Sequence, residues 1–97
     1  MKLYLSGPMS GMADFNFPAF HAEAKRLRSL GYVIVSPAEI NPDTTMTWEQ
    51  CLRDDIKALC DCDGIALMDG WEGSKGAHLE LHIAHRLGLE VKTCAAL

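Results

Sequence analysis

The stretch that decides the fold is Gly64-Ile65-Ala66-Leu67-Met68-Asp69-Gly70, together with the helical segment that follows it. A short apolar run that ends at a turn is typical of a strand buried on both faces. Residues 75–87 then carry apolar side chains at helical spacing, and Gly88 ends that segment. A buried strand that leads into a helix is the unit from which parallel α/β sheets are built.

The same alternation of strand and helix extends to both ends of the chain. Further strands are predicted over residues 2–6, 32–35 and 89–93, and further helices over residues 17–30 and 47–60. Asn16 is predicted to cap the first helix, and Thr47 opens the second through a capping box with Gln50. Residues 37–45 are rich in Pro, Asn, Asp and Thr and are predicted to form a loop.

These elements predict an α/β fold that forms a single domain over residues 1–97. Right-handed crossovers between parallel strands would give a Rossmann- or flavodoxin-like three-layer sandwich with a sheet of four to five parallel strands. In such sheets, ligands bind at the carboxyl ends of the strands.

Composition excludes several classes of function. The 97 residues are 48% hydrophobic and carry a net charge of −4, which argues against general attraction to nucleic acid polymers or anionic membranes. The longest apolar runs are too short to span a membrane, and the N-terminus has no signal-peptide pattern. We therefore expect a cytoplasmic protein whose four cysteines are free thiols.

Two carboxylates interrupt the apolar stripes of predicted helices. Glu80 falls within the stripe Ala77, Leu81, Ala84 and Leu87, and Asp55 falls within the stripe Trp48, Leu52, Ile56 and Leu59. A carboxylate that points toward a core is costly unless it is paired, hydrogen-bonded or placed in a cavity. Two such acids suggest an acid/base or nucleophile pair. The alternative is a pair of structural acids that helix N-termini or a nearby cation satisfy.

Polar and glycine residues gather where the strands end. Ser6-Gly7 and Asp69-Gly70 follow predicted strands, so they are candidate ligand contacts. Ser74-Lys75-Gly76 stands at a predicted helix N-terminus, where free amides, a hydroxyl and an ammonium group suit a phosphate. The alternative there is an ordinary Ser cap followed by a solvated Lys.

Three histidines share one side of the last predicted helix. The spacing of His78, His82 and His85 permits metal binding in principle. That side lies opposite the apolar face and has no matching Cys or acid cluster, so a solvated or interface-lining stripe is favoured. We expect no metal and no cofactor.

Taken together, these residues resemble the nucleoside 2-deoxyribosyltransferase superfamily, in particular its short phage-type members of unassigned role and the 2′-deoxynucleoside 5′-monophosphate N-glycosidases. The resemblance rests on Tyr4 with Ser6-Gly7 in the first strand, Asp55 on the middle helix, and a late helix with Glu80, Ala84 and Gly88. It spans nearly the whole chain. His82 stands where the family pattern has a glycine.

The resemblance implies a chemical role for each catalytic residue. Glu80 would attack the anomeric carbon of the sugar and form a covalent glycosyl-enzyme. Tyr4 would hold that carboxylate in position, and Asp55 would contact the base and protonate its departing ring nitrogen. The resemblance also implies a homodimer or higher homo-oligomer, because a neighbouring subunit completes the site in such proteins.

The identity of residue 74 indicates the class of substrate. The transferases that resemble this chain carry an acid six residues before the nucleophile, whereas the glycosidases that act on monophosphates carry a Ser. Ser74 followed by Lys75 therefore favours a (deoxy)nucleoside 5′-monophosphate over a free nucleoside, and hydrolysis over transfer. The alternatives are a nucleoside 2-deoxyribosyltransferase and a non-catalytic nucleotide-binding module. The sequence leaves the base and the sugar open.

Overall fold

The computed structural model describes all residues, 1–97, and contains one sheet of four parallel strands. The strands are β1 (Lys2–Ser6), β2 (Val33–Val35), β3 (Gly64–Leu67) and β4 (Glu90–Thr93). The helices are α1 (Phe17–Ser29), α2 (Pro37–Ile40), α3 (Trp48–Cys60) and α4 (Lys75–Arg86). Single 3-10 turns are η1 (Ala13–Asn16), η2 (Trp71–Gly73) and η3 (Cys94–Ala96). The predicted α/β class and parallel sheet are confirmed, with four strands.

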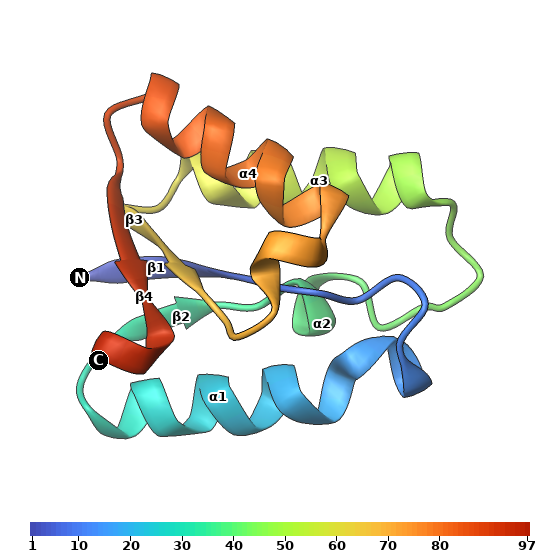
Figure 1. The fold of residues 1–97 in the computed structure, drawn as a ribbon, viewed down its shortest axis with the longest axis horizontal. Coiled ribbons are helices and arrows are strands. Elements are labelled where there is room, and N and C mark those ends of the chain that lie inside the picture. The colour runs from blue at the N-terminus through green and yellow to red at the C-terminus, as the bar shows by residue number, and fades with distance from the viewer.

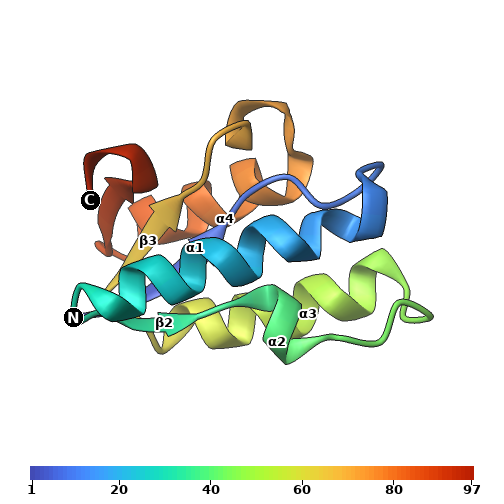
Figure 2. The ribbon, with the colours of Figure 1, turned by 90° about the horizontal axis from the view of Figure 1, so that it is seen from below.

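The helices cover both faces of the sheet, so the fold has three layers. Helix α1 lies on one side, and α3 and α4 lie on the other (Figures 1 and 2). Because side chains alternate along a strand, Leu3 and Leu5 of β1 join the core beneath α1, whereas Tyr4 joins the core beneath α3 and α4. The β1 residues Tyr4 and Ser6 thus share the face that α4 covers.

The strand order places a natural binding site at one edge of the sheet. The order is β2-β1-β3-β4, so the chain leaves β1 toward β2 and later returns on its other side as β3. Such a reversal opens a crevice at the carboxyl ends of the two central strands. Residues 7–10 follow β1 directly at this point.

Two local predictions are wrong. Asn16 stands at the N-cap of α1 but has a left-handed backbone and makes no side-chain cap; instead its Nδ2 atom donates to the carbonyl of Pro8 at 2.9 Å. The predicted loop 37–45 begins with the short helix α2, because Pro37 suits a first helical position.

No helix is both long and apolar enough to cross a membrane.

The capping box at the start of α3 is confirmed. The Thr47 hydroxyl accepts from the Gln50 backbone N–H at 3.2 Å, and the Gln50 Oε1 atom accepts from the Thr47 N–H at 2.9 Å. Each bond satisfies a backbone or side-chain group at a helix end that would otherwise lack a partner. The cap fixes where the helix that carries Asp55 begins.

We expect Thr47→Ala to lower the free energy of unfolding by about 1 kcal/mol, because it removes the cap acceptor. Urea denaturation followed by circular dichroism measures this change. Thr44→Ala, at an exposed position three residues earlier, is the control. An equal effect of the two substitutions would contradict a stabilising role for the cap.

Candidate active site

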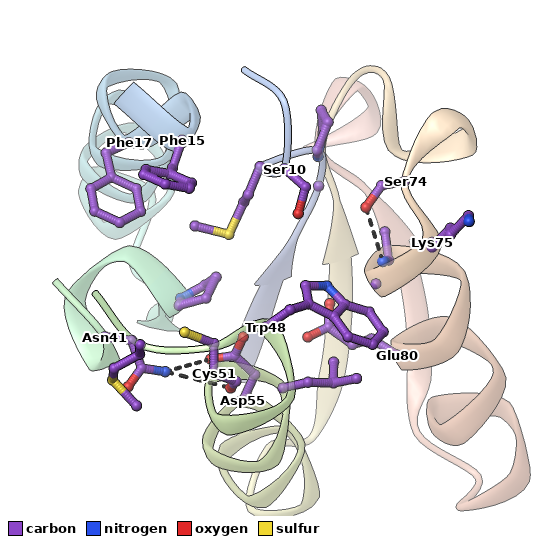
Figure 3. Close-up of a pocket in the computed structure, with 18 of the residues that line it drawn as sticks. Ser10, Phe15, Phe17, Asn41, Trp48, Cys51, Asp55, Ser74, Lys75 and Glu80 are labelled. Carbon is purple, nitrogen blue, oxygen red and sulfur yellow. Dashed lines mark hydrogen bonds between the residues drawn. The ribbon is translucent and has the colours of Figure 1, made fainter. Parts of the chain in front are cut away.

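A cavity of about 600 Å³ opens at the carboxyl end of β1. Its lining comes from β1 and the segment after it, from the start of α1 and the turn before it, from α2 and the segment that follows it, and from the N-terminal parts of α3 and α4 (Figure 3). This volume falls in the range of small-molecule sites. The lining includes Tyr4, Gly7, Ser10, Phe15, Asn41, Trp48, Cys51, Asp55, Ser74, Lys75, Gly76 and Glu80.

Glu80 lies deep in this cavity and is only 6% exposed. The Tyr4 hydroxyl donates to its Oε2 atom at 2.6 Å, and the Ser6 hydroxyl donates to its Oε1 atom at 2.7 Å. Both donors project from the same face of β1, two residues apart. A carboxylate that accepts from a separate donor on each oxygen is held in one orientation.

Burial dominates the acidity of Glu80. Loss of solvent raises the pKa of Glu80 to about 7, the hydrogen bonds from Tyr4 and Ser6 oppose this rise, and the charge of Asp55 adds to it. The same burial and the neighbouring carboxylates hold the pKa of Tyr4 well above its ordinary value. Tyr4 therefore stays protonated and remains a donor to the Glu80 carboxylate.

Asp55 is the second acid of the cavity and is 8% exposed. It is held from one side, where the Asn41 Nδ2 atom donates to its Oδ1 atom at 3.3 Å. Burial raises the pKa of Asp55 to about 6, while the Asn41 hydrogen bond lowers it and Asp54 raises it. A carboxyl with this pKa can give up a proton near neutral pH.

Neither buried acid has a cationic partner. The ion pairs of the protein join Arg26 to Glu23, Arg28 to Glu39 and Lys92 to Glu90, all away from the cavity. Neutral hydroxyl and amide donors alone hold Glu80 and Asp55. No cationic side chain of the protein therefore neutralises this pair, which was one of the two arrangements proposed for structural acids; the other was satisfaction by helix N-termini.

The first turn of α4 forms another part of the cavity wall. The Ser74 hydroxyl caps the helix by accepting from the Ala77 N–H at 3.2 Å. Lys75 is exposed and, with Gly76, lines the cavity (Figure 3). The ordinary Ser cap, which is the alternative to a phosphate site, is thus present. The Ser74 hydroxyl and the helix N-terminus lie on the same cavity as Glu80, whereas the exposed side chain of Lys75 points outward in Figure 3.

Most of the predicted site residues meet in this cavity. Glu80, Asp55, Tyr4, Gly7, Ser74 and Gly76 all line it. Ser6 is fully buried and touches Glu80 without lining the cavity, so in this structure it supports the carboxylate. Asp69 and Gly70 line a separate open depression beside α1 and are not brought to the cavity.

Two other lining residues, Asn41 and Cys51, are not predicted as site residues from the sequence. Asn41 follows α2 and reaches Asp55, a contact between residues fourteen positions apart that no local pattern signals. Cys51 stands one helical turn before Asp55 and lines the same wall. Trp48 belongs to the apolar stripe predicted for α3, and the sequence allows it either to pack in the core or at its rim or to stack on a base. It is 49% exposed and lines the cavity.

The histidine stripe is exposed. His78 stacks against Trp71 with ring centroids 5.2 Å apart, and its Nε2 atom lies 2.6 Å from the Glu72 carbonyl oxygen. No group of three or more His, Cys, Asp or Glu side chains lies close enough together to hold a metal ion.

We expect Glu80→Gln to stabilise the fold more at pH 8 than at pH 5. The folded state raises the pKa of Glu80 from 4.5 to about 7, so ionisation disfavours folding increasingly across this interval and fully above it. The gain in unfolding free energy at pH 8 should exceed the gain at pH 5 by about 2–3 kcal/mol. Changes in hydrogen bonding that are independent of pH cancel in this comparison.

Urea denaturation at the two pH values measures this gain. Glu49→Gln removes an exposed acid from the first turn of α3 and is the matched control. A gain for Glu80→Gln that is the same at both pH values would contradict the raised pKa.

Comparisons with known proteins found a similar solved structure and a matching family model. No curated protein matches the chain. Among solved structures, the chain is similar to a 2-deoxyribosyltransferase from the psychrotolerant bacterium Bacillus psychrosaccharolyticus, with a TM-score of 0.73. The two are 22% identical, and the similarity covers 96% of this chain and 71% of the other. A family model described as a domain of unknown function, DUF4406, matches residues 1–93. The chain belongs to this DUF4406 family.

Proposed function

We propose that the protein is an N-glycosidase that cleaves the base–sugar bond of (deoxy)nucleoside 5′-monophosphates through a covalent glycosyl-Glu80 intermediate. The observation that carries the proposal is the arrangement of Glu80 in the cavity: a buried carboxylate that two hydroxyl donors hold and that forms no ion pair with a cationic side chain. The fold similarity to a 2-deoxyribosyltransferase supports a nucleoside as the class of substrate.

The first chemical step uses Glu80 as the nucleophile. One carboxylate oxygen forms a bond to the anomeric carbon while the bond from that carbon to the base nitrogen breaks. Tyr4 and Ser6 keep the carboxylate oriented, which reduces the reorganisation needed to reach the transition state. Water then hydrolyses the glycosyl ester and releases the sugar phosphate and Glu80.

Asp55 assists departure of the base. The electron pair of the broken bond goes to the base, and a proton from Asp55 neutralises it at a ring nitrogen. A pKa raised to about 6 by burial keeps part of the Asp55 population protonated near neutral pH. The base therefore leaves as a neutral molecule, and the negative charge that Glu80 loses on forming the glycosyl ester passes to the Asp55 carboxylate.

The start of α4 is the proposed phosphate site. Ser74, Lys75 and Gly76 combine a hydroxyl, a positive charge and free backbone amides on the wall of the cavity. A phosphate bound there would keep the sugar within reach of Glu80, one and a half turns further along the same helix.

Two alternatives use the same cavity. In a nucleoside 2-deoxyribosyltransferase, a second base in place of water would accept the sugar, as the fold similarity suggests. In a non-catalytic nucleotide-binding module, the nucleotide would be bound and released unchanged. We further propose that the protein acts as a homodimer or higher homo-oligomer.

We expect the protein to release free base from at least one nucleoside 5′-monophosphate, and Glu80→Ala to abolish that release. Asp55→Asn should lower the rate at least about 100-fold, because it removes the proton donor. Chromatography of reactions with a panel of ribo- and deoxynucleoside 5′-monophosphates measures the product. Glu49→Gln, which removes an exposed acid outside the cavity, should leave the rate unchanged.

The outcomes separate the three functions. Base release only when a second free base is supplied would identify a transferase. Nucleotide binding without base release would identify a binding module. Undiminished release in Glu80→Ala would overturn the proposed role of this residue.

We expect Ser74→Asp to lower kcat/KM for a monophosphate at least about tenfold relative to the corresponding nucleoside, because a carboxylate repels the phosphate. Ser74→Asn is the matched control, since Asn and Asp both cap helices well but only Asp adds charge. Comparison of nucleotide and nucleoside kinetics in the two variants measures the effect. An equal loss in both variants would contradict phosphate binding at this position.

A further inference from the structure

The side chain of Asn41 is held through its amide nitrogen. It is 9% exposed, and its Nδ2 group donates to Asp55 Oδ1 at 3.3 Å and to the Cys51 carbonyl oxygen at 3.5 Å (Figure 3). Both neighbours of this group are acceptors. A reversed amide would set Oδ1 against two acceptor oxygens, so the observed orientation is the one that satisfies the contacts.

The other end of the amide is left without a partner in the protein. No donor of the chain reaches Asn41 Oδ1. The only fully enclosed polar side-chain atom without a partner is Ser36 Oγ. Asn41 lines the cavity, and its Oδ1 atom is thus an acceptor that is not fully enclosed. A buried carboxamide that uses only its donor end is a site for a ligand donor.

Asn41 and Asp55 together present a donor and an acceptor side by side. When Asp55 is protonated and its Oδ1 atom accepts from Asn41, Oδ2 is the oxygen left to carry the proton. The wall therefore offers an O–H donor from Asp55 and a C=O acceptor from Asn41. The complementary ligand edge has a ring-nitrogen acceptor next to an N–H donor.

Nucleobases fall into two groups when their edges are compared with this pair of a donor and an acceptor. Adenine has the N7 acceptor beside the N6 amino donor, and cytosine has the N3 acceptor beside the N4 amino donor. Guanine and hypoxanthine place an O6 acceptor beside N7, and uracil and thymine have O4 as an acceptor. An exocyclic oxygen would face Asn41 Oδ1, and two acceptors in contact without a proton between them are unfavourable.

We propose that Asn41 selects the base, and that the site takes nucleotides with an exocyclic amino group beside a ring-nitrogen acceptor, namely adenine or cytosine nucleotides, over their oxo counterparts. This inference rests on the proposed function for the placement of the base against Asp55. The proton moves from Asp55 Oδ2 to the ring nitrogen as the bond to the sugar breaks, while Asn41 holds the amino group.

The test uses substrate pairs that differ in the amino or oxo group. They are deoxyadenosine and deoxyinosine 5′-monophosphate, and deoxycytidine and deoxyuridine 5′-monophosphate. We expect kcat/KM to favour the amino member of a productive pair at least about tenfold, the discrimination typical of a good base contact. In Asn41→Ala the activity on the amino member should fall, and the two members should come within about threefold of one another.

A binding measurement separates this inference from the proposed function. Glu80→Gln, which should not turn over, is titrated with both members of each pair by calorimetry. Tighter binding of the amino member supports the inference even if the unsubstituted protein releases no base. Equal binding, or tighter binding of the oxo member, overturns it even if the protein proves to be a glycosidase.

If Asn41→Ala does not fold, the substrate pairs on the unsubstituted protein still test the proposal. A preference for the oxo members would overturn it. If Asn41→Ala folds, as judged by circular dichroism and thermal unfolding, a preference that stays unchanged in it also overturns the assignment to Asn41.

Discussion

Both the fold and the site depend on one set of contacts, the hydrogen bonds from two hydroxyls of β1 to the Glu80 carboxylate. Tyr4 and Ser6 reach the same acid because side chains two residues apart share one face of a strand. Their bonds fix the position of α4 against the sheet, and thereby the position of the helix N-terminus that Ser74 caps. A shift of β1 by one residue would turn both hydroxyls toward α1 and leave Glu80 without donors.

The cavity is maintained at the expense of stability. Two carboxyls without cations are buried on one side of the sheet, and burial raises the pKa of each. A protein selected for stability alone would place apolar side chains at these positions on the helix stripes, as Ala77 and Ala84 do beside Glu80. Loss of stability at a polar cavity is the usual signature of a functional site.

The sequence was sufficient to predict features that depend on residues close together along the chain. The capping box at Thr47, the buried strand β3 and the misplaced acids Glu80 and Asp55 all appear as local patterns, and the structure contains each of them. Apolar spacing overstated burial at the end of α4, where Leu87 is 54% exposed.

Contacts between distant segments were beyond such patterns. The amide of Asn41 finds Asp55 through the packing of α2 on α3, and Asn16 reaches back to Pro8 in place of capping α1. The loop after β3 turns toward α1, which takes Asp69 and Gly70 away from the cavity. Strand-end position alone predicted the correct edge of the sheet but could not assign each residue to one of its two sides.

The handedness of one turn shapes the mouth of the cavity. Asp14, Phe15 and Asn16 all have positive φ angles of 51° to 60°, which L-residues rarely adopt and which costs roughly 1 kcal/mol or more per residue. This left-handed turn places Phe15 on the cavity wall, with its ring centroid 6.0 Å from that of Phe17. The Asn16 bond to Pro8 ties the turn to the end of β1. A relaxed, right-handed path would carry the Phe15 ring elsewhere, so backbone chirality here sets how wide an opening a ligand meets.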